Sequence, residues 1–166
     1  MTSKQSLLAK IADRSAVVGI CGLGYVGLPL SLRFSQAGFR VLGFDIDRGK
    51  VEALNGGHSY IGHIGDAPVA AARAKGFEAT GDFARAAEAD VLIICVPTPL
   101  GHNREPDLSF IFATLESLAS HLRAGQLLSL ESTTYPGTTE EELRPRLERL
   151  GFTVGKDFFL VFSPER

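Results

Sequence analysis

The stretch Gly22-Leu23-Gly24-Tyr25-Val26-Gly27 follows an apolar run at residues 17–21 and precedes a segment of helical periodicity. Glycines in this pattern between a strand and a helix are typical of a dinucleotide-binding turn. The first permits the tight turn, the second lets a pyrophosphate approach the backbone, and the third lets the helix pack closely on the strand. The helix directs free amide groups and its positive dipole end at the phosphates. We therefore predict that Gly22, Gly24, Tyr25, Val26 and Gly27 bind the cofactor.

An acidic residue, Asp45, stands eighteen positions beyond the last glycine and ends the apolar run 41–44. In a dinucleotide fold this position accepts hydrogen bonds from the adenosine ribose. A carboxylate there favours NAD over NADP, because a 2'-phosphate would meet a like charge. The alternative, that Asp45 only caps the following helix, is compatible with this role. Lys50 lies within reach of the same ribose or a phosphate, although a solvated helix lysine fits its spacing equally well.

Composition and charge narrow the class of protein. The 166 residues, 45% of them hydrophobic and 22% charged, suffice for one domain with a full core. A formal net charge of -2 without a basic run argues against a nucleic-acid partner. Neither a signal-peptide core nor a membrane span of about 20 apolar residues is found, so we expect a cytoplasmic protein without membrane contact. The four histidines form no metal-ligand pattern, and we predict no metal site.

Short apolar runs alternate with amphipathic segments from Ser15 onward. Such runs are typical of strands covered on both faces. We predict an α/β fold of the Rossmann type, a doubly wound parallel sheet of order 3-2-1-4-5-6 with helices on both faces. Residues 1–14 are expected to form an N-terminal helical extension, and residues 15–166 an NAD-binding domain. The predicted strands are 17–21, 41–44, 77–80, 91–96, 127–131 and 158–162, and the predicted helices are 25–36, 47–55, 67–74, 84–87, 108–122 and 138–150.

Two strand tips carry side chains suited to a ligand at the carboxyl edge of this sheet. Prolines, Pro97 among them, flank Thr98 after the fourth strand and would hold its hydroxyl at the crevice, although a plain turn is the alternative interpretation. Hydroxyls are dense at residues 131–138 after the fifth strand, where they suit a ligand or a helix start. Thr138 and Glu141 resemble a capping box.

These stretches, taken in order, resemble the UDP-glucose/GDP-mannose dehydrogenase family over residues 17–166. The resemblance is carried by Gly22-Leu23-Gly24-Tyr25-Val26-Gly27-Leu28-Pro29, Gly43-Phe44-Asp45-Ile46-Asp47, Cys95-Val96-Pro97-Thr98-Pro99-Leu100, residues 131–137 and Ser163-Pro164-Glu165-Arg166. Residues 55–61 and 132–139 are most similar to the branch that oxidises UDP-N-acetylhexosamines such as UDP-N-acetylglucosamine at C6. Enzymes of the family use two NAD molecules to oxidise the sugar alcohol to a carboxylate, with a cysteine thioester on the way.

The resemblance implies a role for each matching residue. Asp45 and Lys50 would bind the adenosine ribose, while Pro97 and Thr98 would contact the cofactor. Thr133 would contact the cofactor and orient the catalytic water or the substrate, a role that Thr134 is also placed to share. Glu165 would belong to the acid/base machinery.

The family's catalytic cysteine, its lysine and its substrate domains match nothing up to residue 166. Cys21 and Cys95, the only cysteines, end buried strands and are expected to be reduced core residues that cannot replace that cysteine. We expect the chain to bind NAD but to oxidise a UDP-sugar only together with those domains, as a homodimer or higher oligomer. The alternatives are a self-standing module that senses NAD without catalysis and a different Rossmann dehydrogenase acting on hydroxy acids.

Overall fold

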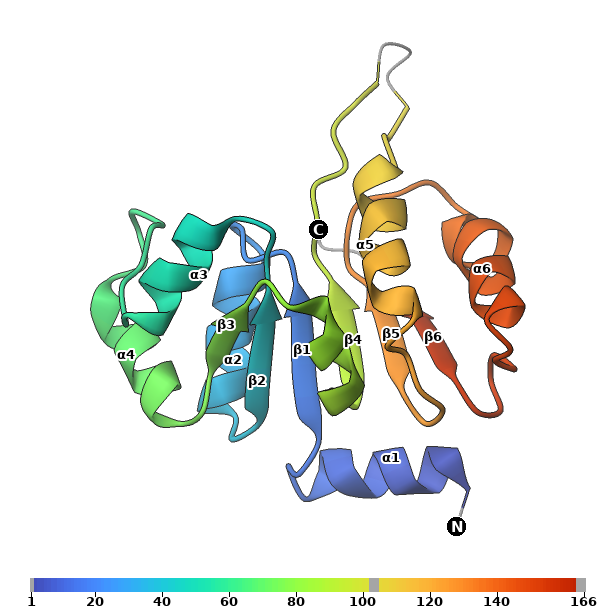
Figure 1. Ribbon diagram of the computed structural model, residues 1–166, viewed down its shortest axis with the longest axis horizontal. Helices are drawn as coiled ribbons and strands as arrows, with labels where there is room; N and C mark the ends of the chain where they lie inside the picture. The colour runs from blue at the N-terminus through green and yellow to red at the C-terminus, as the bar shows by residue number, and fades with distance from the viewer. Residues whose placement is uncertain (1, 102–104, 164–166) are drawn as a thin grey trace.

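A six-stranded parallel sheet forms the centre of the computed structural model, which describes residues 2–101 and 105–163. Its order is β3-β2-β1-β4-β5-β6, as predicted (Figure 1). The observed strands lie within two residues of the predicted limits, because each is a buried apolar run closed by turn residues. They are β1 (Val17–Cys21), β2 (Arg40–Phe44), β3 (Glu78–Thr80), β4 (Val91–Ile94), β5 (Leu127–Leu130) and β6 (Phe159–Phe162).

At least one helix connects each pair of consecutive strands. The helices are α1 (Ser3–Ala12), α2 (Gly27–Gln36), α3 (Arg48–Asn55), α4 (Asp66–Ala74), a 3-10 helix η1 (Phe83–Glu88), α5 (Ser109–Ala119), a π-helix η2 (Thr138–Leu143) and α6 (Arg144–Arg149). The predicted start of α2 at residue 25 and the predicted end of α5 at residue 122 were both wrong. Residues 24–26 are occupied by the glycine turn, and α5 ends at Ala119 with Ser120 as its C-cap.

The predicted helix at residues 138–150 is two helices, and its predicted capping box was wrong. Gly137 precedes η2 with a φ of 96° and no side chain caps it. The hydroxyl of Thr138 instead donates to the carbonyl oxygen of Tyr135 at 2.7 Å, which closes the preceding turn. Glu141 donates its backbone N–H to the carbonyl of Gly137 at 2.8 Å. The Thr138 hydroxyl therefore closes the turn before η2 and does not cap the helix.

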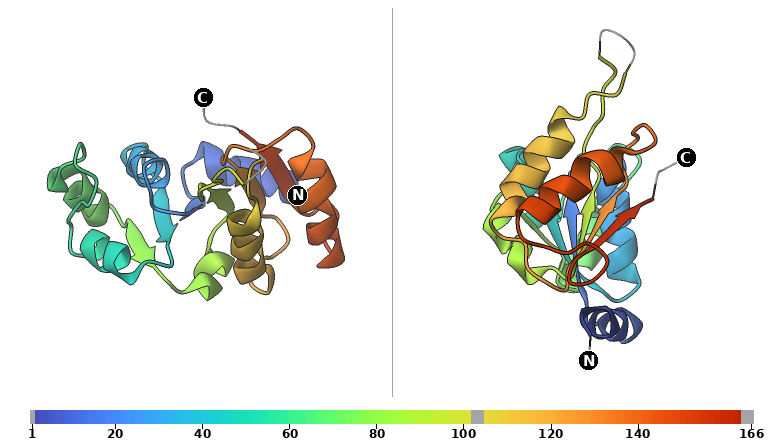
Figure 2. Two further views of the ribbon diagram at one scale, coloured as in Figure 1. Left: turned by 90° about the horizontal axis from the view of Figure 1, so that it is seen from above. Right: turned by 90° about the vertical axis from the view of Figure 1, so that its right-hand side faces the viewer.

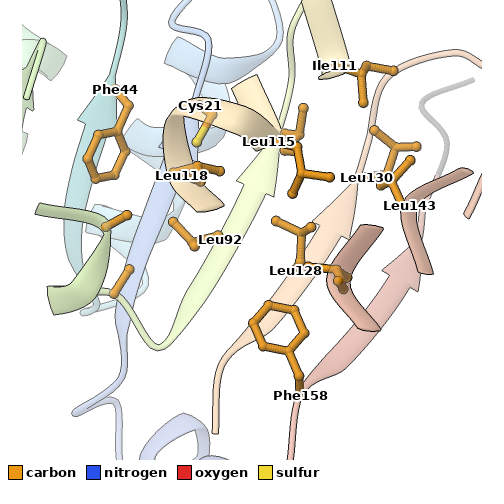
Figure 3. Close-up of a cluster of buried hydrophobic side chains, with 14 of the residues drawn as sticks. Cys21, Phe44, Leu92, Ile111, Leu115, Leu118, Leu128, Leu130, Leu143 and Phe158 are labelled. Carbon is orange, nitrogen blue, oxygen red and sulfur yellow. The ribbon is translucent and has the colours of Figure 1, made fainter. Parts of the chain in front are cut away.

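Helices cover both faces of the sheet, as predicted. The right-hand view of Figure 2 shows α5 and α6 on one side of the strands and α2 on the other. One core cluster joins the sheet to η1, α5, η2 and α6, and its side chains interlock between strands and helices in Figure 3. A second cluster joins the opposite face to α2, α3 and α4. Burial of both clusters leaves the carboxyl ends of the strands open at one edge.

Helix α1 lies across the opposite edge of the sheet, below the amino ends of the strands (Figure 1). Asp90, whose side chain is 6% exposed, accepts hydrogen bonds from Lys10 Nζ at 2.8 Å and Arg123 at 2.9 Å. Its second oxygen accepts from the backbone N–H of Val17 at 3.0 Å. Burial alone would raise the pKa of Asp90, but the hydrogen bonds from Lys10, Val17 and Arg123 together hold that pKa below its usual range. This carboxylate fastens α1 to the sheet.

Candidate functional site

A cleft of about 890 Å³ opens at the carboxyl edge of the sheet. The strand register places it there, because Cys21 at the end of β1 stands beside Phe44 of β2 and Ile94 of β4. The residues that follow these three strands therefore meet at one level. Nine predicted site residues line the cleft: Gly22, Gly24, Tyr25, Val26, Asp45, Lys50, Pro97, Thr98 and Thr133. Gly27 lies just below it as the first residue of α2, and Glu165 lies outside the described residues.

The three glycines of the turn have different surroundings. Gly22 has a φ of 93°, and a Cβ there would lie 2.9 Å from the carbonyl oxygen of Cys95. A Cβ on Gly27 would lie 1.7 Å from the carbonyl oxygen of Gly22. A Cβ on Gly24 would meet no atom within 4 Å, although this residue lines the cleft. The fold itself therefore requires glycine at the first and third positions, whereas the second leaves room for a ligand.

The carboxylate of Asp45 is 9% exposed and organises the loops around the cleft. Its Oδ2 accepts from the backbone N–H of Leu23, and its Oδ1 accepts from that of Asp47, each at 2.9 Å. The helix cap is supplied by Asp47, which accepts from the N–H groups of Gly49 and Lys50 at 2.9 and 3.2 Å. The alternative in which Asp45 only caps the helix was therefore wrong. Since each carboxylate oxygen has two lone pairs, Asp45 keeps acceptor capacity toward the cleft.

Lys50 and Tyr60 complete this side of the cleft. Nζ of Lys50 lies 3.8 Å from Oδ2 of Asp45 and 5.8 Å from the centre of the Tyr60 ring. The hydroxyl of Tyr60 donates to the carbonyl oxygen of Leu23. Burial, with the negative charges of Asp45 and Asp47, raises the pKa of Tyr60, so its hydroxyl remains a donor. In the sequence, Tyr60 lies in residues 55–61, which resemble the N-acetylhexosamine branch of the family, but the sequence indicated no role for it at the site.

The tips of β4 and β5 form the other side of the cleft. The hydroxyl of Ser132 donates to the carbonyl oxygen of Val96 at 2.7 Å, which ties the two tips together. Thr98 is half-buried and Thr133 is exposed, and both line the cleft. Thr134 does not line it, since its Oγ1 is buried with no hydrogen-bond partner among the described residues. The structure thus brings Thr133 to the site and leaves Thr134 outside.

Helix α5 adds a wall to the cleft that the sequence did not indicate. Phe110, Ala113, Thr114 and Ser117 line it from successive turns of this helix. Their spacing of three and four residues puts them on one stripe. The sequence indicated the buried stripe of α5 but not this second stripe. Half-exposed residues such as Phe110 are normal on a helix surface, so they do not indicate a ligand site.

The two cysteines, Cys21 and Cys95, both line this cleft. Cys21 is buried, and burial raises the pKa of its thiol well above the usual range. Cys95 directly follows β4 and packs against the second core cluster. Across residues 2–101 and 105–163, no group of three or more His, Cys, Asp or Glu side chains is arranged to hold a metal ion. Within the same ranges, no helix is long and apolar enough to span a bilayer.

A profile of the UDP-glucose/GDP-mannose dehydrogenase family, NAD binding domain, matches residues 16–166. The chain belongs to this family. The UDP-N-acetyl-D-glucosamine 6-dehydrogenase of Pseudomonas aeruginosa is 37% identical to it over 150 residues, which cover 90% of this chain and 35% of that protein. This dehydrogenase-family chain therefore spans about a third of the length of such relatives.

Solved structures of family members share the fold of this chain. The UDP-N-acetyl-mannosamine dehydrogenase Cap5O of Staphylococcus aureus matches with a TM-score of 0.83 and 34% identity, over 91% of this chain and 37% of that one. The NDP-N-acetyl-D-galactosaminuronic acid dehydrogenase of Methanosarcina mazei Go1 matches with a TM-score of 0.86 and 32% identity, over 100% of this chain and 38% of that one.

NAD is the cofactor of the family's matching domain, and the cleft fits it. The open side of Gly24 leaves space for a pyrophosphate, and the helix behind it begins at Gly27 with an N-cap, Val26, that makes no side-chain hydrogen bond. Asp45 lines the cleft beside this turn and keeps acceptor capacity toward it. The prediction of an NAD-binding Rossmann domain is confirmed.

Proposed function

We propose that the whole protein is an NAD-dependent dehydrogenase that oxidises the C6 alcohol of a UDP-sugar to the uronate in two steps. The observation that carries this proposal is the convergence of the glycine turn, Asp45, Thr98 and Thr133 on one cleft in a chain of this family. The N-acetylhexosamine dehydrogenases among its relatives support a UDP-N-acetylhexosamine as the sugar.

In this proposal the cleft residues divide the cofactor among them. Gly22, Gly24 and Gly27, with Tyr25 and Val26, form the turn that receives the pyrophosphate. Asp45 and Lys50 bind the adenosine ribose, and the carboxylate disfavours the 2'-phosphate of NADP. Pro97 and Thr98 contact the cofactor from the tip of β4. Bound NAD supplies the hydride acceptor for the oxidation.

The remaining assignments concern the substrate. We assign Thr133 to the cofactor and to the catalytic water or sugar, and Glu165 to proton transfer. Each of the two oxidations removes a hydride from the sugar C6 and a proton from the oxygen bound to it. Water then hydrolyses the thioester, which releases the cysteine thiol and supplies the second carboxylate oxygen. Because Cys21 is buried with a raised thiol pKa, we assign the covalent step to a cysteine outside residues 1–166. Because the reaction uses NAD and a nucleotide sugar, we propose that the protein is cytoplasmic. We also propose that the whole protein forms a homodimer or higher oligomer.

Calorimetric titration and an activity assay test this proposal. The 166-residue chain should bind NAD more tightly than NADP, and the whole protein should form NADH with UDP-N-acetylglucosamine or UDP-N-acetylmannosamine in preference to UDP-glucose. Two NADH per sugar are expected. Binding of NAD without turnover of any of the three sugars would favour the sensing module instead, and failure to bind NAD would refute the cofactor assignment.

A further inference from the structure

The peptide unit of Leu23, between the first two glycines of the turn, is held from two directions. Its backbone N–H donates to Oδ2 of Asp45 at 2.9 Å, and its carbonyl oxygen accepts from the hydroxyl of Tyr60. Its side chain is fully buried and packs tightly against Gly43 of β2. Both polar backbone groups and the side chain of this residue are therefore restrained.

The carbonyl of Leu23 and the N–H of Gly24 belong to one planar trans peptide, in which they point in opposite directions. A side chain that fixes the direction of the carbonyl therefore fixes the direction of the amide as well. Gly24 lines the cleft, and a Cβ on it would meet no atom within 4 Å. The hydrogen bond from Tyr60 thus determines how the Gly24 amide is presented to a ligand.

Tyr60 is itself carried by a well-anchored segment, residues 56–65, between α3 and α4. The next residue, Ile61, is 3% exposed and inserts into the second core cluster. The backbone N–H of Ser59 donates to Asp66 at 2.8 Å. Further along, His63 stacks on Tyr25 of the glycine turn, with ring centroids 6.3 Å apart. The segment therefore contacts the turn at two points and delivers the Tyr60 hydroxyl from a fixed frame.

We propose that Tyr60 is a positioning residue that aims the Gly24 amide at the cofactor's pyrophosphate. The proposal rests on NAD binding as proposed above. Tyr60 acts through the Leu23–Gly24 peptide and not by contact with the reacting atoms. Its ring face, 5.8 Å from Lys50 Nζ, also keeps that ammonium beside Asp45.

The test uses Tyr60→Phe in the 166-residue chain, with Tyr135→Phe as the matched control, because Tyr135 does not line the cleft. Loss of one orienting hydrogen bond should weaken NAD and ADP-ribose binding by about threefold to tenfold. Adenosine, which has no pyrophosphate, should bind the variant and the wild type alike. Tyr135→Phe should bind all three ligands like the wild type.

The outcomes separate this proposal from the proposed function. Unchanged NAD affinity in Tyr60→Phe, or an equal loss of adenosine affinity, would overturn the role of Tyr60 while leaving NAD binding intact. Absence of NAD binding in the wild type would instead refute the proposed function. A second measurement needs no variant: in the ¹⁵N-labelled wild type, the Gly24 amide resonance should shift with ADP-ribose and not with adenosine. A Gly24 resonance indifferent to ADP-ribose would also overturn the proposal.

Discussion

Replacing Asp45 by asparagine should destabilise the chain even though the two side chains have the same shape. The wild-type carboxylate accepts one backbone N–H on each oxygen, from Leu23 and from Asp47. Asparagine offers one oxygen and one NH₂ group, so one of these two N–H donors must face another donor. The structure therefore requires a carboxylate, with its two acceptors, at this position.

The magnitude follows from the burial of these partners. Leaving one partly buried N–H without its acceptor costs about 1–3 kcal/mol. The lost attraction to Lys50, 3.8 Å away and 35% exposed, adds less than about 1 kcal/mol. For a chain of this size we expect Tm to fall by about 2–10 °C. Affinity for NAD should fall as well, and discrimination against NADP should weaken, because the negative charge is gone.

Urea unfolding followed by circular dichroism measures this loss, and Asp47→Asn is the matched control. Asp47 uses a single oxygen, Oδ1, to accept from Gly49 and Lys50. Asparagine serves as a helix N-cap as well as aspartate does, so this control should unfold within about 0.5 kcal/mol of the wild type. Equal unfolding midpoints for Asp45→Asn and Asp47→Asn would refute the two-acceptor reasoning.

Two further predictions concern the glycine turn and the attachment of α1. Gly24→Ala should unfold like the wild type but lose at least about tenfold in NAD affinity. Gly27→Ala should lower the unfolding midpoint strongly, since its Cβ would overlap the Gly22 carbonyl. Urea unfolding measures the stability and calorimetry the NAD affinity, and an equal loss of stability in both variants would contradict this prediction. Asp90→Asn should destabilise by about 1–3 kcal/mol at neutral pH. The folded-state pKa of Asp90 is lowered, so its contribution is complete above about pH 4 and disappears as pH falls through the folded pKa. A difference between wild type and Asp90→Asn that did not shrink as the pH was lowered below about 4 would contradict the assignment.

The sheet could be predicted from the sequence because its strands are buried on both faces, so each is a short apolar run. The ends of the strands then located the cleft, since parallel strands expose their carboxyl ends at one edge. Helix ends were less predictable. At Thr138 the hydroxyl can cap a helix or close the turn before it, and the two choices differ by local hydrogen bonds that the residue pattern does not distinguish.

Tyr60 shows why part of the site was not predictable. Its partner is the carbonyl oxygen of Leu23, 37 residues earlier in the chain, and a backbone acceptor has no sequence signature. The sequence correctly predicted that Asp45 lines the cleft, because a residue directly after a parallel strand lies at the carboxyl edge of the sheet. It did not predict that Asp45 also holds the Leu23 N–H, a contact that depends on how the turn folds back over β2.

The glycine pattern itself combines two kinds of requirement that look alike in the sequence. Gly22 and Gly27 are needed because a Cβ would strike the backbone of this same chain, so their cause is internal to the fold. A Cβ on Gly24 would meet no atom of the chain within 4 Å, and the two hydrogen bonds to the backbone of Leu23 restrain the neighbouring backbone. Folding alone gives no reason for a glycine there. The pyrophosphate that we propose beside Gly24 supplies a reason, since a side chain there would occupy the space of the ligand.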